Sequence, residues 1–218
     1  MALERETVVR AALVLLNDVG LDGLTVRRLA DHLGVQNPAL YWHFKNKQDL
    51  LDEMAKTMIA DAFAGLKPPA TNEPWADWLA EVAERFHLTL LTHRDGARII
   101  AAADLTASAL LGIEELALSV LTTAGFDLRA ALMGIVTIFD YTLGAAFEEQ
   151  SEPDHPKWGR SSLFESRRPS LDPAHLPLLA AAFDEITNTT TNHPTLGFKG
   201  GLHLLLAGMV ATKKAPAT

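Results

Sequence analysis

Apolar residues three or four positions apart dominate this chain, and glycine, proline or a capping residue interrupts them at short intervals. At the N-terminus this spacing predicts a first helix that ends at Gly20. A second short helix should begin after the N-cap Thr25 and end at Gly34, and a third should begin with Asn37 as N-cap and Pro38 in its first turn. No alternating strand pattern of convincing length occurs in the sequence, so we predict an all-α fold.

The second and third predicted helices, joined by a tight glycine-containing turn, form a pattern typical of helix-turn-helix DNA-binding units. The third helix can bury Leu40 and Phe44, which leaves Trp42 and His43 on other faces. Tyr41, Trp42 and Phe44 could instead be core aromatics of a small domain. Taken as a group beside His43, however, they favour a surface that meets a partner.

The formal charge of the chain is -8, with 19 Lys and Arg against 27 Asp and Glu, and this balance alone argues against nucleic acid as a partner. The charge is divided unevenly, because residues 1–50 hold as many basic as acidic side chains and the rest of the chain carries the whole surplus. Between Arg27 and Lys47 only Asp31 opposes the basic groups. A locally basic head can bind polyanions, because the field of the phosphates is screened beyond about 10 Å.

The chain divides at a loop over residues 66–74, which contains three prolines. Before the loop, Asn46 is expected to cap a longer helix whose inner stripe runs from Leu51 to Ala62, and the first turn of this helix with Lys47 could hold a phosphate. We therefore predict a helix-turn-helix domain over residues 1–47, a connecting helix over 48–66 and a helical body over 67–218.

Within the body, helices are expected over residues 75–91, 97–103, 106–124, 128–150, 177–187 and 195–212, with Asp127 as an N-cap. Residues 151–176, which are rich in proline, serine and charge, are interpreted as a mobile connection. The last two helices are rich in leucine and alanine, and Gly197, Gly201 and Gly208 would allow close helix approach. This pattern fits a subunit interface and an internal core equally well.

Other function classes find little support in the sequence. The chain has no cysteine, so a disulfide, a thiol nucleophile or a cysteine-ligated metal is excluded. His93-Arg94-Asp95 imitates a kinase triplet, but Ile100 stands where the metal-binding asparagine is required, and Asp95-Gly96 is expected to shape a turn instead. Neither the scattered histidines nor the serines suggest a metal or catalytic site. We expect a cytoplasmic protein that is not an enzyme, crosses no membrane and needs no metal or cofactor.

Several segments resemble the TetR family of transcriptional regulators, in particular its tetracycline-repressor branch. They span nearly the entire chain, and the body segments are more specific than those in the head. They are residues 24–30, 38–43 and 45–47 in the head and residues 91–98, 125–126, 139–144 and 147–150 in the body. The resemblance implies a homodimeric repressor that binds operator DNA through the head and a small-molecule effector through the body.

The family's DNA contacts can be carried over position by position. The resemblance implies that Arg27 or Arg28, Asn37 and Ala39 set the preference for sequence, since they match positions that reach base edges. The remaining positions would meet apolar groups, sugar or phosphate. The complete implied DNA-binding set is Thr25, Arg27, Arg28, Asn37, Pro38, Ala39, Tyr41, Trp42, His43 and Lys47.

The implied ligand site departs from that of the branch, which chelates magnesium-tetracycline through a histidine and a following Thr-Arg-Pro. Ile100 and Ala103-Asp104-Leu105 occupy those positions here, so the imidazole for chelation is lost. We therefore predict a more apolar effector that is not magnesium-tetracycline. The predicted lining is Phe63, Val82, Phe86, Ile100, Leu132, Ile135 and Phe139, with polar contacts from Asp104, Thr137 and Glu148.

The mechanism implied is that effector binding beneath the connecting helix moves this helix as a lever. The movement would change the spacing of the paired recognition helices from the roughly 34 Å that consecutive major grooves require. The alternative is an all-α ligand-sequestering protein or enzyme that retains a vestigial DNA-binding head.

Overall fold

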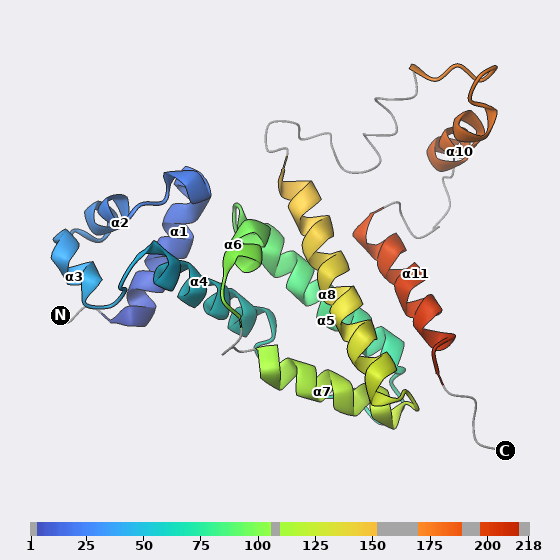
Figure 1. Ribbon diagram of the computed structural model, residues 1–218, viewed down its shortest axis with the longest axis horizontal. Coiled ribbons are helices and arrows are strands. Elements are labelled where there is room, and N and C mark those ends of the chain that lie inside the picture. The colour runs from blue at the N-terminus through green and yellow to red at the C-terminus, as the bar shows by residue number, and fades with distance from the viewer. Residues whose placement is uncertain (1–3, 106–109, 152–169, 189–196, 214–218) are drawn as a thin grey trace.

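The computed structural model describes residues 4–105, 110–151, 170–188 and 197–213, and within these ranges the chain is helical without a strand, as Figure 1 shows. The predicted all-α class is confirmed. The helices are α1 (Arg5–Gly23), α2 (Val26–Leu33), α3 (Asn37–Tyr41), α4 (Lys47–Ala62), α5 (Trp75–Thr92), α6 (Gly96–Ala102), α7 (Leu110–Thr123), α8 (Leu128–Gln150), α10 (Pro177–Asn188) and α11 (Phe198–Val210).

Helices α1 to α3 form the head, and local chemistry explains most of their boundaries. Helix α1 breaks at Gly20, whose φ of 68° suits glycine, and α2 begins where the Thr25 hydroxyl accepts a hydrogen bond from the Arg28 N–H at 3.2 Å. Gly34 ends α2 in the left-handed conformation, as predicted. The prediction for Asn37 is wrong: α3 already includes it, and Gln36 is the N-cap, without a capping side-chain hydrogen bond.

Helix α4 connects the head to the body (Figure 1). Its predicted cap is confirmed, because the Asn46 side chain accepts a hydrogen bond from the Asp49 N–H at 2.9 Å. The inner stripe of α4, including Met54, Met58 and Ile59, is buried in one apolar cluster that also contains residues of α1, α2, α5 and α6. A displacement of α4 must therefore disturb both the head and the first layer of the body.

Helix α8 is the central helix of the body and packs against α5, α6, α7 and α11. The predicted Asp127 N-cap is confirmed, since its carboxylate accepts a hydrogen bond from the Ala130 N–H at 2.8 Å. By length and hydropathy alone α8 could cross a membrane, but the core helix of a soluble protein passes the same test. Its inner face contributes Ala131 and Ile138 to a second apolar cluster.

Helix α11 lies along α8, and glycine permits the close approach. A Cβ at Gly201 would overlap the Tyr141 hydroxyl of α8, which donates a hydrogen bond to the Phe198 carbonyl at 2.9 Å. This part of α11 is thus internal, while Leu204 on the same helix is 74% exposed. Helix α10 stands apart from the other helices (Figure 1). The predicted helix starts at residues 106 and 195 and most of the predicted mobile connection fall outside the described residues.

Candidate functional site

Helix α3 lies at the end of the head that is farthest from the body (Figure 1), and aromatic side chains at and beside its end are exposed. Leu40 and Phe44 anchor it and are only 2% and 5% exposed, whereas Tyr41 is 56% and Trp42 is 89% exposed. The predicted orientation of these residues is confirmed. An indole in water contributes nothing to the core of the head, so its place on the surface needs another explanation.

The residues predicted to meet DNA lie on α2, on α3 or beside their ends, except Lys47, which is the first residue of α4; we call the whole set the α2–α3 surface. Among the described residues, the guanidinium of Arg27 makes no hydrogen bond or ion pair. Arg28 donates to the Gly23 carbonyl at 3.0 Å and Lys47 donates to the Leu21 carbonyl at 3.0 Å. Arg27 is therefore the more available base-reading arginine, while Arg28 and Lys47 also hold the corner between α1 and α2.

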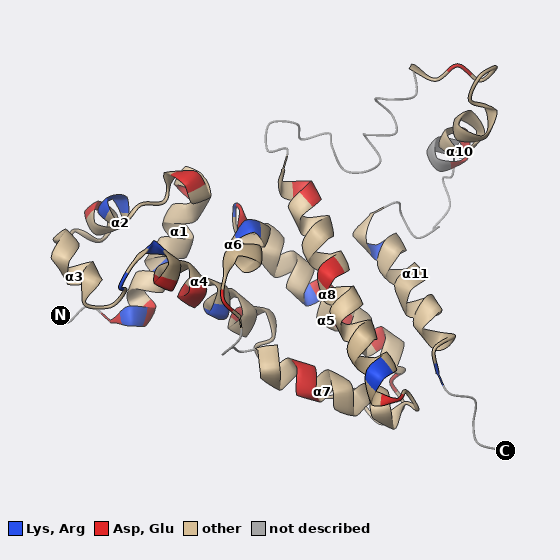
Figure 2. Ribbon diagram, in the orientation of Figure 1, with Lys and Arg blue, Asp and Glu red and all other residues tan. Residues whose placement is uncertain are grey.

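The other members of this surface are accessible to different degrees. Asn37 and Pro38 are exposed, while Ala39 and His43 are half-buried. Figure 2 shows Lys and Arg on α2 and beside the start of α4, on either side of the uncharged α3. Basic groups flanking an uncharged, protruding helix are suited to phosphates on both sides of a groove.

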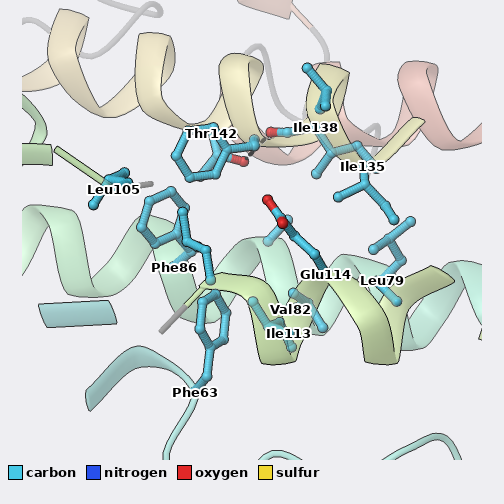
Figure 3. A pocket seen from close by; sticks show the side chains of 15 residues that line it. Phe63, Leu79, Val82, Phe86, Leu105, Ile113, Glu114, Ile135, Ile138 and Thr142 are labelled. Atoms are coloured by element: carbon cyan, nitrogen blue, oxygen red, sulfur yellow. Dashed lines mark hydrogen bonds between the residues drawn. The ribbon is translucent and has the colours of Figure 1, made fainter. Parts of the chain in front are cut away.

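The second candidate site is an apolar cavity of about 150 Å³ between α5, α7 and α8. Figure 3 shows its side chains converging from these helices, with Phe63 entering from the end of α4. Phe86 is stacked between Phe63 and Phe139, at centroid distances of 6.1 Å and 5.2 Å. These rings form an aromatic wall. The described residues that line it are Phe63, Leu79, Val82, Ala83, Phe86, Leu105, Leu110, Ile113, Glu114, Ala117, Ile135, Val136, Ile138, Phe139 and Thr142.

The structure brings together half of the residues predicted for the ligand site, namely Phe63, Val82, Phe86, Ile135 and Phe139. The other predicted residues lie elsewhere. Ile100 is buried in the cluster of α4, α5 and α6, and Leu132 is 48% exposed on α8. Asp104, Thr137 and Glu148 are exposed. The reason on α8 is helical phase, because Thr137 is about half a turn around the helix from Ile135, as is Glu148 from Phe139.

Sequence reasoning missed most of the lining, above all the part from α7. On α5 the signal was present, since Leu79, Val82, Ala83 and Phe86 follow helical spacing along one face. Spacing of this kind identifies a buried face but does not distinguish a cavity from a packed core. Helix α7 gave no such signal for Glu114, because a charged residue is normally assigned to the solvent side of a helix.

A polar junction connects the α5–α6 turn of the body to the head. Asp95 occupies the turn with a φ of 58°, and its carboxylate accepts hydrogen bonds from the Leu21 N–H at 2.8 Å and from Arg98 at 3.0 Å. Arg98 also pairs with Asp22 at 3.1 Å. The hydrogen bond from Arg98 and the charge of Arg98 lower the pKa of the Asp22 carboxyl. The predicted turn at Asp95-Gly96 is confirmed, and its Asp95 carboxylate bonds to the head at Leu21.

Gln150, at the end of α8, extends this junction toward the cavity. Its side-chain N–H groups donate to the carbonyls of Leu90 and His93, at 2.7 Å and 2.8 Å. Its side-chain carbonyl accepts from the Ala97 N–H at 3.0 Å. One residue thus ties α8, which lines the cavity, to the end of α5 and the start of α6, where the head is attached.

Comparisons with known proteins identify the family of the head and of the body. A family model described as bacterial regulatory proteins, tetR family, matches residues 8–54, and one described as tetracyclin repressor-like, C-terminal domain, matches residues 68–213. The chain is 41% identical to the tetracycline repressor protein class A from transposon 1721 of Escherichia coli over 208 residues, which cover 95% of this chain and 90% of that relative.

Solved structures give the same result at the level of the fold. A TetR variant from Acinetobacter baumannii AYE in complex with minocycline has 34% identity and a TM-score of 0.73, and the match covers 98% of this chain and 99% of that one. BioQ with its natural double-stranded DNA operator has 27% identity and a TM-score of 0.66, with 96% and 99% covered.

Proposed function

Because this chain belongs to the tetR family of bacterial regulatory proteins and is a ligand-responsive, DNA-binding transcriptional repressor, we propose that a small apolar molecule in the apolar cavity releases it from its operator. The observation that carries the proposal is the continuous connection between the two sites, from the cavity along α8 through Gln150 to the turn at Asp95. We propose a cytoplasmic regulator and no catalytic role.

The α2–α3 surface is the proposed DNA contact. Trp42 and Tyr41 would pack on sugar and phosphate, and Arg27, with no partner of its own among the described residues, would reach a base edge or a phosphate. Support comes from BioQ, a protein of similar fold whose structure contains its operator. The acidic residues of the body stay away from the phosphates in this arrangement.

The proposed effector differs from magnesium-tetracycline. Minocycline occupies one structure of similar fold, but the imidazole that would chelate magnesium is replaced here by the buried Ile100. In the described part of the chain no group of three or more His, Asp or Glu could hold a metal ion. A cavity of about 150 Å³ is also large enough to admit a ring such as benzene.

We also propose that the repressor is a homodimer joined through α8 and α11. Both helices expose large apolar side chains, which include Leu128, Met133, Leu204 and Val210, at 55% exposure or more. Large apolar side chains exposed on two neighbouring helices are typical of a subunit interface. Pairing of two heads by this interface would present two α3 helices to consecutive major grooves, about 34 Å apart.

The test of DNA binding is fluorescence anisotropy with a duplex from the promoter region of the protein's own gene. Affinity should fall steeply as salt rises from about 50 mM to about 200 mM, because phosphate contacts release counterions. Trp42→Ala should weaken binding about tenfold, the loss expected for one good contact, without lowering the melting temperature. Val14→Ala, a change to an exposed residue on α1, is the matched control. An affinity for the duplex that changes neither with salt nor with Trp42→Ala would refute the proposal.

The effector proposal has a separate test in the same assay. Magnesium-tetracycline added to the protein–DNA complex should not release the duplex at the low concentrations at which a chelating repressor responds. Efficient release would show that chelation survives without the imidazole, and the proposed change of specificity would be wrong.

A further inference from the structure

Glu114 is the charged side chain in the lining of the apolar cavity. It rises from α7, and Figure 3 shows its carboxylate oxygens directed toward the middle of the ring of lining residues. Apart from Glu114 and Thr142, that lining consists of aliphatic and phenyl groups. Glu114 is half-buried, and the part of its carboxylate that faces this apolar space loses hydration there unless a partner compensates.

The protein itself supplies no such partner among the described residues, since Glu114 makes no hydrogen bond or ion pair there. The nearby hydroxyl of Thr142 donates its proton to the Ile138 carbonyl at 2.7 Å. Its oxygen remains an acceptor and cannot donate to Glu114 at the same time. The polar lining of the cavity therefore accepts hydrogen bonds but offers no donor.

The aromatic wall supplies the hydrophobic side of the site. The rings of Phe63, Phe86 and Phe139 line the cavity together with Glu114. Because Phe86 is stacked between the other two rings, the wall offers a ligand apolar surface and no charge. A carboxylate and phenyl rings around one apolar space together favour a positively charged, hydrogen-bond-donating group on a hydrophobic body.

We propose that Glu114 selects the effector and that the effector is a hydrophobic monocation, such as a protonated amine attached to an aromatic or aliphatic ring. The inference rests on the proposed function and narrows it, because the largely apolar effector proposed above would carry one positive charge. The volume of about 150 Å³ suits a single ring. The ammonium group would pair with Glu114, and the ring would lie against the apolar lining.

Isothermal titration calorimetry at neutral pH with small probes of one shape tests the assignment. The probes are benzylammonium, the uncharged benzyl alcohol and ethylbenzene, and the anion benzoate. Benzylammonium should bind at least about tenfold more tightly than ethylbenzene, the effect of one hydrogen bond to a charged group. Benzoate should bind least, since it meets a like charge.

Glu114→Gln retains the shape of the side chain and removes its charge. It should weaken benzylammonium binding about tenfold and leave ethylbenzene binding unchanged. Glu115→Gln is the matched control, because Glu115 is adjacent on α7 and exposed. Glu115→Gln should bind every probe with the same affinity as the unmodified protein.

Three results would each overturn the assignment: equal affinities for the cation and the neutral probes, an equal loss of affinity for all probes in Glu114→Gln, or no binding of any probe. Operator binding measured on the same preparation separates this failure from failure of the proposed function. Tight binding of ethylbenzene without preference for the cation would leave an apolar effector site in place. Loss of specific DNA binding would remove the repressor proposal itself.

Discussion

The imidazole of His87 lies parallel to the ring of Phe198, with centroids 3.9 Å apart and an interplanar angle of 6°. Its Nε2 is 3.2 Å from a carboxylate oxygen of Glu149. Burial lowers the pKa of His87, and this effect exceeds the opposing influence of Glu149. A neutral imidazole is thus the stable form in the contact that joins α5, α8 and α11.

This contact predicts how stability depends on pH. Because the folded pKa of His87 lies below its ordinary value of about 6.5, the unfolded chain binds the proton first as pH falls. The free energy of unfolding should be fully retained well above about pH 6.5 and decline as the pH falls through and below that value.

His87→Phe retains the stacked ring and removes the titration, so its unfolding free energy, measured by urea denaturation across this range, should decline less than that of the unmodified protein. Part of the decline should persist in His87→Phe, because burial also lowers the pKa of His93. An unchanged pH profile in His87→Phe would contradict this account.

Single residues also mark what could be predicted from sequence. Thr25, Asn46 and Asp127 were identified as N-caps because a cap depends on one side chain and an N–H three residues later. Asn37 failed the same rule, since the turn before α3 makes Gln36 the cap. Glu114 could not be found at all, because its importance arises only where α7 meets α5 and α8.

At the scale of elements, the junction at the end of α8 is the main determinant of how the body holds the head. Gln150 both donates and accepts, whereas Glu at this position could only accept. Gln150→Glu retains a partner for the Ala97 N–H and leaves the carbonyls of Leu90 and His93 facing a carboxylate.

Gln150→Glu should therefore destabilise the protein by about 2 kcal/mol, the cost of leaving partly buried polar groups unpaired. Chemical denaturation measures the change, and Asp140→Asn, at an exposed position of α8, should alter stability by less than about 0.5 kcal/mol. Equal stabilities of the two variants would show that the junction does not stabilise the protein.

The helices themselves were largely predictable, and their faces were not. The predicted range 128–150 coincides with α8, and 75–91 differs from α5 by one residue at its end. Helical spacing and caps are local properties, so they survive without tertiary information. Which stripe of α8 meets α5, α7 or α11 depends on packing, and for that reason the sequence did not show that Leu132, Thr137 and Glu148 lie away from the cavity.

At the scale of the molecule, the proposed DNA surface and the proposed effector cavity lie in separate regions joined by α4 and by the junction at Asp95. The net charge of -8 is compatible with DNA binding because the head is neutral and the surplus of acidic groups lies in the rest of the chain. The motif resemblance implies that one region binds DNA and another binds the effector. The structure adds the contacts that connect the two regions.

The proposed dimer follows from the exposed apolar face of α8 and α11. Leu204→Glu, at a position that is 74% exposed, should convert the dimer to a monomer and weaken operator binding, since one head loses its partner. Analytical ultracentrifugation gives the mass. Leu111→Glu, at an exposed position on α7, is the control and should remain dimeric. A monomeric unmodified protein that binds its operator fully would contradict the dimer.

The central claim is that occupation of the apolar cavity and binding of the operator oppose each other. The direct measurement is the anisotropy of a labelled operator duplex, with and without a saturating amount of whichever aromatic probe binds most tightly. We predict that DNA affinity falls at least about fivefold and that the affinity for the probe falls by the same factor on the DNA-bound protein. Unchanged or increased DNA affinity with the cavity saturated would contradict the account.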